Sequence, residues 1–158
     1  MNVAMRSLIL SLVLAALASA QSHPDFSGTW KQDNSRSTIR PGSTIQYSNK
    51  IEQRGQKLTV TTILGANGDR KESTYTREYV IGDKAGTSSD REGDQFTNTV
   101  KWDGDSLVFE TVEKEKTATL TSREVWTLSP DGKTLTKKLY RTGGRGGDSD
   151  QTYVLEKQ

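Results

Sequence analysis

Beyond the first twenty residues, apolar and polar side chains alternate with a period of two in short runs. This period is typical of strands with one buried face, and almost no run has the period of a helix. Turn signals such as Asn67-Gly68 and Asp103-Gly104 separate the runs. The pattern predicts strands at 28–33, 44–53, 57–64, 71–81, 95–102, 106–114, 117–128, 134–141 and 151–157, and a weaker one at 86–91.

Consecutive strands joined by short turns leave two exposed edges unless the sheet closes on itself. We therefore predict an all-β fold, a single up-and-down antiparallel β-barrel of eight to ten strands. When the weak strand at 86–91 is counted, the tight turns at 54–56, 103–105 and 129–133 share one end of the barrel. Most of the longer connections then gather at the other end, where we expect an open mouth.

The first twenty residues have the features of a secretory signal peptide. Arg6 supplies a positive charge, residues 8–17 form an apolar run, and Ala18-Ser19-Ala20 is a small-residue cleavage site. The apolar run is short for a membrane span, so a retained anchor is the less favoured alternative. We expect residues 1–20 to be removed, 21–27 to form a flexible tail, and 28–158 to form the barrel domain. The mature protein would then be periplasmic or secreted and not membrane-anchored.

Composition removes several classes of function. Basic and acidic residues number 22 and 20, and this near balance argues against a nucleic-acid partner. The chain has no cysteine, which removes disulfides, thiol nucleophiles and Cys-ligated metals. Its one histidine, His23, falls in the expected tail, so we expect no metal site, no haem or other cofactor, and no Ser-His-Asp triad. The glycine-rich segment at 143–147 lacks the Lys-Ser/Thr ending of a phosphate loop.

The motif Gly28-Thr29-Trp30 opens the first predicted strand. Glycine permits close backbone approach, and a tryptophan ring can fill the closed end of a small barrel while its N–H finds a partner. Residues 24–31, 102–105 and 126–136 together resemble small secreted lipocalin-like proteins of soil bacteria, especially acidobacteria, in the calycin superfamily. The resemblance extends over the mature chain and implies a lipocalin-like barrel in which Gly28 and Trp30 are structural. It implies no established activity.

The chain departs from typical lipocalins in two respects. It lacks their disulfide and the helix that precedes their last strand. A count of ten strands is closer to the fatty-acid-binding and nitrobindin-like barrels. However, residues 34–43 are too few, and too rich in Pro and Gly signals, for a two-helix lid.

Several polar residues fall in register with apolar ones, where burial without a partner is costly. Arg77 lies between Tyr75 and Tyr79, and Glu124 is in register with Trp126. The candidate cavity residues are Tyr47, Tyr75, Arg77, Tyr79, Asn98 and Glu124. Three interpretations stay open. Arg77 meets an acidic group of a ligand, or Arg77 and Glu124 pair across a filled interior, or the register slips and both face solvent.

Arginines in the loops at the expected mouth are a second set of candidates. Basic rims attract anions and form paired hydrogen bonds with carboxylates. The rim candidates are Arg40, Arg70 and Arg145, with Arg36 and Arg91 in the same group of loops. Aspartates share these loops, so solvated surface charge is the favoured interpretation.

These observations favour a binding protein over an enzyme, because no catalytic constellation is present. The first hypothesis is an exported barrel that binds a small, largely apolar molecule in its interior, with an acidic group on that molecule left open. The alternative is an interaction protein, such as a protease inhibitor, that engages a protein partner through its N-terminal tail. An open cavity favours the first, and a filled barrel with an ordered tail favours the second. An enzyme on the same scaffold is a weaker third option.

Overall fold

The computed structural model describes residues 23–39, 46–69, 71–89, 93–143 and 147–158. All regular structure in these residues is β-strand, which confirms the predicted fold class. The weak strand expected at 86–91 is present as β5, with shifted bounds. The ten strands are β1 (Gly28–Gln32), β2 (Tyr47–Arg54), β3 (Lys57–Leu64), β4 (Ser73–Val80), β5 (Gly82–Ser89), β6 (Gln95–Asp103), β7 (Ser106–Lys114), β8 (Thr119–Leu128), β9 (Thr134–Gly143) and β10 (Ser149–Lys157).

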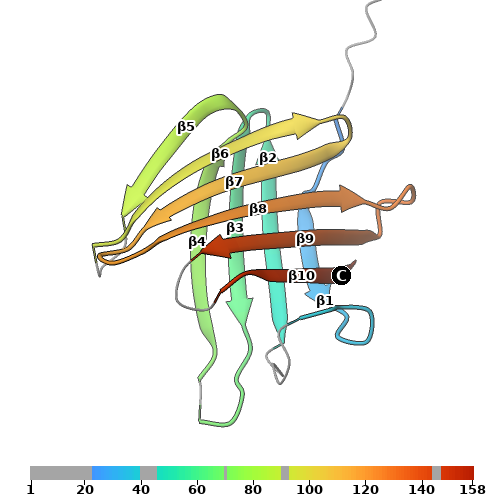
Figure 1. Cartoon of the computed structure of the whole chain (residues 1–158). Helices are drawn as coiled ribbons and strands as arrows, with labels where there is room; N and C mark the ends of the chain where they lie inside the picture. The colour runs from blue at the N-terminus through green and yellow to red at the C-terminus, as the bar shows by residue number, and fades with distance from the viewer. Residues whose placement is uncertain (1–22, 40–45, 70, 90–92, 144–146) are drawn as a thin grey trace, which may run out of the picture.

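The strands form one antiparallel sheet in the order β4-β3-β2-β1-β10-β9-β8-β7-β6-β5. The sheet curls so that β1–β4 pass behind and across β6–β10 (Figure 1). Its two edges, β4 and β5, are not hydrogen-bonded to each other, so the barrel is nearly closed rather than closed as predicted. The sequence of β5 explains the gap. It has no large apolar side chain, and its register to β6 shifts between Gly82 and Gly86.

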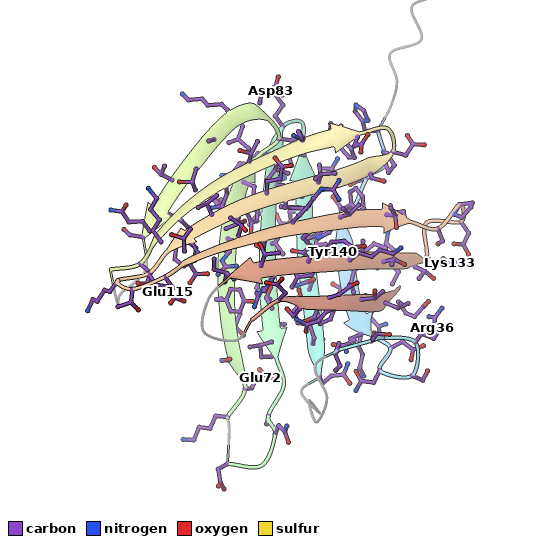
Figure 2. The ribbon with its side chains drawn as sticks, viewed as in Figure 1. Arg36, Glu72, Asp83, Glu115, Lys133 and Tyr140 are labelled. Carbon is purple, nitrogen blue, oxygen red and sulfur yellow. The ribbon has the colours of Figure 1, made fainter. Side chains whose placement is uncertain are left out.

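The interior is polarised along the barrel axis. Tight turns at 54–56, 103–105 and 129–133 lie at one end, as predicted. Lys133 marks this closed end, whereas Glu72 and Glu115 lie on the connections at the mouth (Figure 2). The apolar core gathers towards the closed end and consists of Phe26, Trp30, Ile51, Leu58, Val60, Ile81, Val100, Leu107, Phe109, Trp126, Leu135 and Leu155.

The segment before β1 is packed against the closed end. We expected a flexible tail over 21–27, but its described part, 23–27, contacts the barrel. His23 stacks on Trp102 with ring centroids 4.2 Å apart, and Phe26 is 0 % exposed. The Phe26 backbone N–H donates to Gln53 Oε1 at 3.1 Å, and Trp30 Nε1 donates to the Phe26 carbonyl at 2.9 Å. Burial of the Phe26 ring explains why this short polar stretch is held in place.

Gly28 has the close approach that its motif predicts. Its φ is +141°, and a Cβ there would lie 2.8 Å from Lys157 Cε. Lys157 Nζ is 5.2 Å from the centre of the Trp30 ring, a cation–π contact. The space beside Gly28 is thus occupied by the end of the Lys157 side chain, and the fully buried Trp30 ring lies beneath it.

The described residues between β1 and β2 contain no helix. Residues 34–36 form a turn, and Thr38 bridges to Thr152 of β10. In its described part, residues 33–39, this connection has no lid helices, as its length and its Pro/Gly signals predict.

Candidate functional site

A cavity of about 540 Å³ occupies the mouth half of the barrel. This volume lies within the range of small-molecule sites. The interior is therefore not filled, which removes the filled-interior interpretation. Side chains from β2 to β10 line it, including all six predicted candidates, Tyr47, Tyr75, Arg77, Tyr79, Asn98 and Glu124.

Lys137 of β9 is the central charged group of the wall and is only 2 % exposed. Its Nζ donates to Tyr47 Oη at 2.7 Å and to Asn49 Oδ1 at 3.0 Å. Glu124 Oε1 lies 3.2 Å from the same nitrogen, and the Trp126 ring centre is 4.3 Å away. Two of the three N–H donors of the ammonium are thus used by Tyr47 and Asn49, and the contact with Glu124 is an ion pair.

Opposing effects act on the pKa of Lys137. Burial alone would lower it, but the charges and hydrogen bonds of Glu124 and Tyr47 outweigh burial and raise the pKa above its ordinary value. Lys137 is therefore a protonated cation at neutral pH. Its buried partner Asn49 donates in turn to Thr62 Oγ1 at 2.9 Å, which continues the network to β3.

Arg77 has no carboxylate partner among the described residues. We considered an Arg77–Glu124 pair, but Glu124 pairs with Lys137 instead. The Arg77 guanidinium lies over the Tyr75 ring, 5.2 Å from its centre. Arg141 of β9 also lines the cavity, and no described carboxylate forms a salt bridge with it. Both cations are exposed and form no salt bridge with a described carboxylate, although the cavity-lining Glu113 is near enough for the charges of both to act on its pKa.

Aromatic rings form the rest of one wall. Tyr79 contacts Phe109 edge-on, with ring centroids 5.2 Å apart, and the ring centroids of Phe109 and Trp126 are 4.5 Å apart. Tyr47 and Tyr153 lie 5.3 Å apart. Burial raises the pKa of Tyr79, which the charge of Arg77 partly offsets and that of Glu124 reinforces. Tyr79 is therefore close enough to feel both charged groups.

Asn98 lies on β6 near the mouth. Its Oδ1 accepts a hydrogen bond from Thr111 Oγ1 at 2.8 Å. Asn98 lines the cavity, as do the hydroxyl-bearing residues Thr62, Thr111 and Ser122.

The three rim candidates Arg40, Arg70 and Arg145 fall outside the described residues, as does Arg91. Arg36 is described, and it pairs with Asp33 and Glu156 on the surface. Arg36 thus fits the interpretation of solvated surface charge.

Sequence reasoning missed Lys137 and Arg141. Both lie in register with Leu135 and Leu139 on β9, so the alternation that singled out Arg77 also marks them. Long side chains with charged ends are usually assigned to solvent, which hid the signal.

In the described part of the chain, no group of three or more His, Asp or Glu residues is arranged to hold a metal ion. Over the same residues, no helix has the length and apolarity needed to cross a membrane.

Fold and cavity together define a ten-stranded, nearly closed calycin-type barrel with an internal pocket. Solved structures of this class resemble it across most of the chain. A secretory abundant heat soluble protein of Ramazzottius varieornatus matches with a TM-score of 0.61 at 13% identity, covering 88% of this chain and 99% of that one. A Schistosoma mansoni fatty acid binding protein in complex with arachidonic acid matches with a TM-score of 0.54 at 15% identity, covering 84% and 96%.

A fatty-acid-binding protein from brain tissue of Drosophila melanogaster matches with a TM-score of 0.55 at 16% identity, covering 84% of this chain and 99% of that one. At such identities the likeness establishes the fold alone. No protein-family model matches the chain, and no curated protein matches it by sequence.

Proposed function

We propose that this protein is an exported binding protein that holds a small, largely apolar molecule in its barrel, with an acidic group of that molecule at Arg77 and Arg141. The observation that carries the proposal is the open cavity lined by two cations that have no carboxylate partner among the described residues. A bound carboxylate could form charge-assisted hydrogen bonds with these two guanidinium groups. The structural similarity to fatty-acid-binding proteins adds support for a ligand-holding interior.

Native mass spectrometry tests the proposal first. Protein purified from its own cell envelope is expected to carry extra mass from a co-purified small molecule. Consistent absence of bound mass, together with no uptake of apolar dyes, would count decisively against a ligand carrier.

Substitution of Arg77 tests the placement of the acidic group. Arg77→Ala should weaken the binding of an amphipathic carboxylate about 10- to 100-fold, the range for a hydrogen bond to a charged group. Arg123→Ala is the matched control, because Arg123 lies between the inward-facing Ser122 and Glu124 and so points away from the cavity. Equal binding by the Arg77 variant and the wild type would exclude the proposed role.

The export part of the proposal rests on residues 1–20, which lie outside the described residues. N-terminal sequencing of the mature protein should begin at Gln21. A start at Met1 would contradict cleavage.

The alternative of a protein partner engaged through the tail has less support. Residues 23–27 are anchored to the closed end by the Phe26 ring and by Gln53, whose amide donates to the Pro24 carbonyl at 3.2 Å. A projecting inhibitory tail would need these contacts to be released.

A further inference from the structure

Glu124 presents to the cavity one carboxylate oxygen that no described residue engages. Its Oε1 faces Lys137 Nζ at 3.2 Å, and its side chain is 26 % exposed. Because Glu124 lines the cavity, that exposure is towards the cavity space. No described residue donates a hydrogen bond to Oε2.

The neighbouring cation cannot serve a ligand in place of this carboxylate. Lys137 is only 2 % exposed, donates to Tyr47 and Asn49 and is ion-paired with Glu124, so its ammonium is already engaged by oxygens of the protein. This part of the wall therefore acts as a hydrogen-bond acceptor. A ligand carboxylate would be repelled from Glu124, whereas a hydroxyl or ammonium group would be bound.

Acceptor and cations lie on different parts of the wall. Arg141 is opposite Ser122 at the mouth, and Glu124 is opposite Leu139, two residues further towards the closed end. Arg77 belongs to β4, and Tyr79 of the same strand contacts Phe109 of β7, so the Arg77 side of the cavity meets the Glu124 side through these rings. A ligand that lies along this wall can therefore reach a cation and Glu124 together.

The surface that such a ligand would cross is aromatic. Tyr79, Phe109 and Trp126 contact one another in sequence along this wall. Aromatic rings favour stacked or edge-on contact with other rings, so a ring system fits this surface well.

We infer that the ligand is a ring-containing acid that also carries a hydrogen-bond donor, a hydroxyl or protonated amine, which Glu124 Oε2 accepts. This inference deepens the proposed function and rests on it. The inference predicts that this site does not prefer a plain fatty acid, because an alkyl chain has no donor for the Glu124 oxygen. When a bound ligand displaces the water that can reach this oxygen, a ligand without the donor leaves the acceptor unpaired and therefore binds more weakly.

Matched probes test the inference by isothermal titration calorimetry. Hydroxynaphthoate and naphthoate differ only in the hydroxyl group, and dodecanoate represents a plain fatty acid. In the wild-type protein, hydroxynaphthoate should bind at least about tenfold more tightly than naphthoate. In Glu124→Ala the ratio of the two affinities should fall to about one.

The ratio within one variant is insensitive to partial loss of folded protein, because both probes see the same folded fraction. Glu124→Gln gives a second, shape-preserving variant in which the ratio should fall but not vanish, since an amide oxygen still accepts. Glu110→Ala is the matched control: Glu110 also pairs with a lysine, Lys101 at 3.3 Å, but on the outer face. In Glu110→Ala the ratio of the hydroxynaphthoate and naphthoate affinities should equal that of the wild type.

The outcomes separate the two proposals. Equal binding of naphthoate, hydroxynaphthoate and dodecanoate, all weakened by Arg77→Ala, would overturn the inference and leave the proposed function standing. A hydroxyl preference that survives Glu124→Ala would overturn the assignment to Glu124. Absence of binding by every probe, with no co-purified mass, would overturn both.

Discussion

Replacement of Lys137 by methionine should destabilise the fold because it removes the centre of the buried network. Methionine retains most of the apolar stem but donates no hydrogen bond. Tyr47, Asn49 and Glu124 each lose a donor, and Asn49 is 0 % exposed, so its oxygen cannot turn to water. The cost therefore arises from acceptors that stay behind, rather than from the lost attraction alone.

The magnitude follows from those acceptors. An unsatisfied buried acceptor costs about 1–3 kcal/mol, and Asn49 contributes at the upper part of that range. Glu124 is partly exposed to the cavity and recovers some hydration, so its share is smaller. We expect a total loss of about 3 kcal/mol, which lowers Tm by about 12 °C in a domain of this size.

Urea unfolding followed by tryptophan fluorescence measures this loss. Lys138→Met is the matched control, because Lys138 is the next residue of β9 and is exposed. Its effect should stay within about 0.5 kcal/mol. The pKa of Lys137 is raised in the folded protein, so its contribution to the free energy of unfolding is fully present below its pKa in the unfolded chain. That contribution is lost only as pH rises through its pKa in the folded protein.

The stability difference between wild type and Lys137→Met should therefore be flat from about pH 6 to about pH 9. A Lys137→Met protein as stable as the wild type would refute the reasoning. It would mean that apolar packing replaces the network at no cost, as happens in some buried ion pairs. A difference that shrinks below pH 9 would instead show that Lys137 titrates near neutrality.

Two further predictions concern residues just before and just after β1. Phe26→Ala removes a fully buried ring from the closed end and should cost about 3–5 kcal/mol in urea unfolding; a loss below about 1 kcal/mol would mean that the segment is not anchored. The hydrogen bond from the Ser35 hydroxyl, followed by that from Arg36, lowers the pKa of the Asp33 carboxyl to about 2. Ser35→Ala should raise that pKa in a carbon-detected NMR titration. In the wild type, the stabilisation from Asp33 is present above its unfolded pKa and is lost as pH falls through about 2, so in the variant this loss should begin at a higher pH. An unchanged Asp33 pKa in the variant would exclude Ser35 as the main cause.

The strands could be predicted because alternation and turn residues act locally. Asn67-Gly68 and Asp103-Gly104 interrupt the pattern where the chain reverses. β5 was misplaced by a few residues because its small side chains carry no alternation. The gap between β4 and β5 arises because β5 has no large apolar side chains to pack, and no local sequence pattern predicts such a gap. The packed tail was missed because Phe26 is its one large apolar residue and its neighbours are polar.

The candidate site was predictable as a set of positions but not as a set of partners. Arg77 and Glu124 interrupt apolar faces, and that local signal placed both in the cavity wall. Which charges pair depends on strand order. Trp126 is opposite Lys137 in the β8–β9 ladder, which brings Lys137 diagonally beside Glu124, while Arg77 is on β4, which does not pair with β8. Pairing across the sheet needs this register, which alternation alone does not contain.

The apolar core and the polar part of the cavity therefore lie towards opposite ends of the barrel, with Val60, Phe109 and Trp126 shared by the core and the cavity wall. Core residues such as Leu58, Leu107 and Leu135 follow or precede the tight turns, so the apolar packing that drives folding lies at the closed end. Towards the mouth the same strands present Thr62, Ser122 and other polar groups, which add little hydrophobic stabilisation and leave the cavity open. Polar residues at these inward positions cost less than they would in a filled core, because the cavity admits water or ligand. Substitutions in the mouth half should for this reason change affinity with small changes in unfolding free energy, except at Lys137, where the two halves meet.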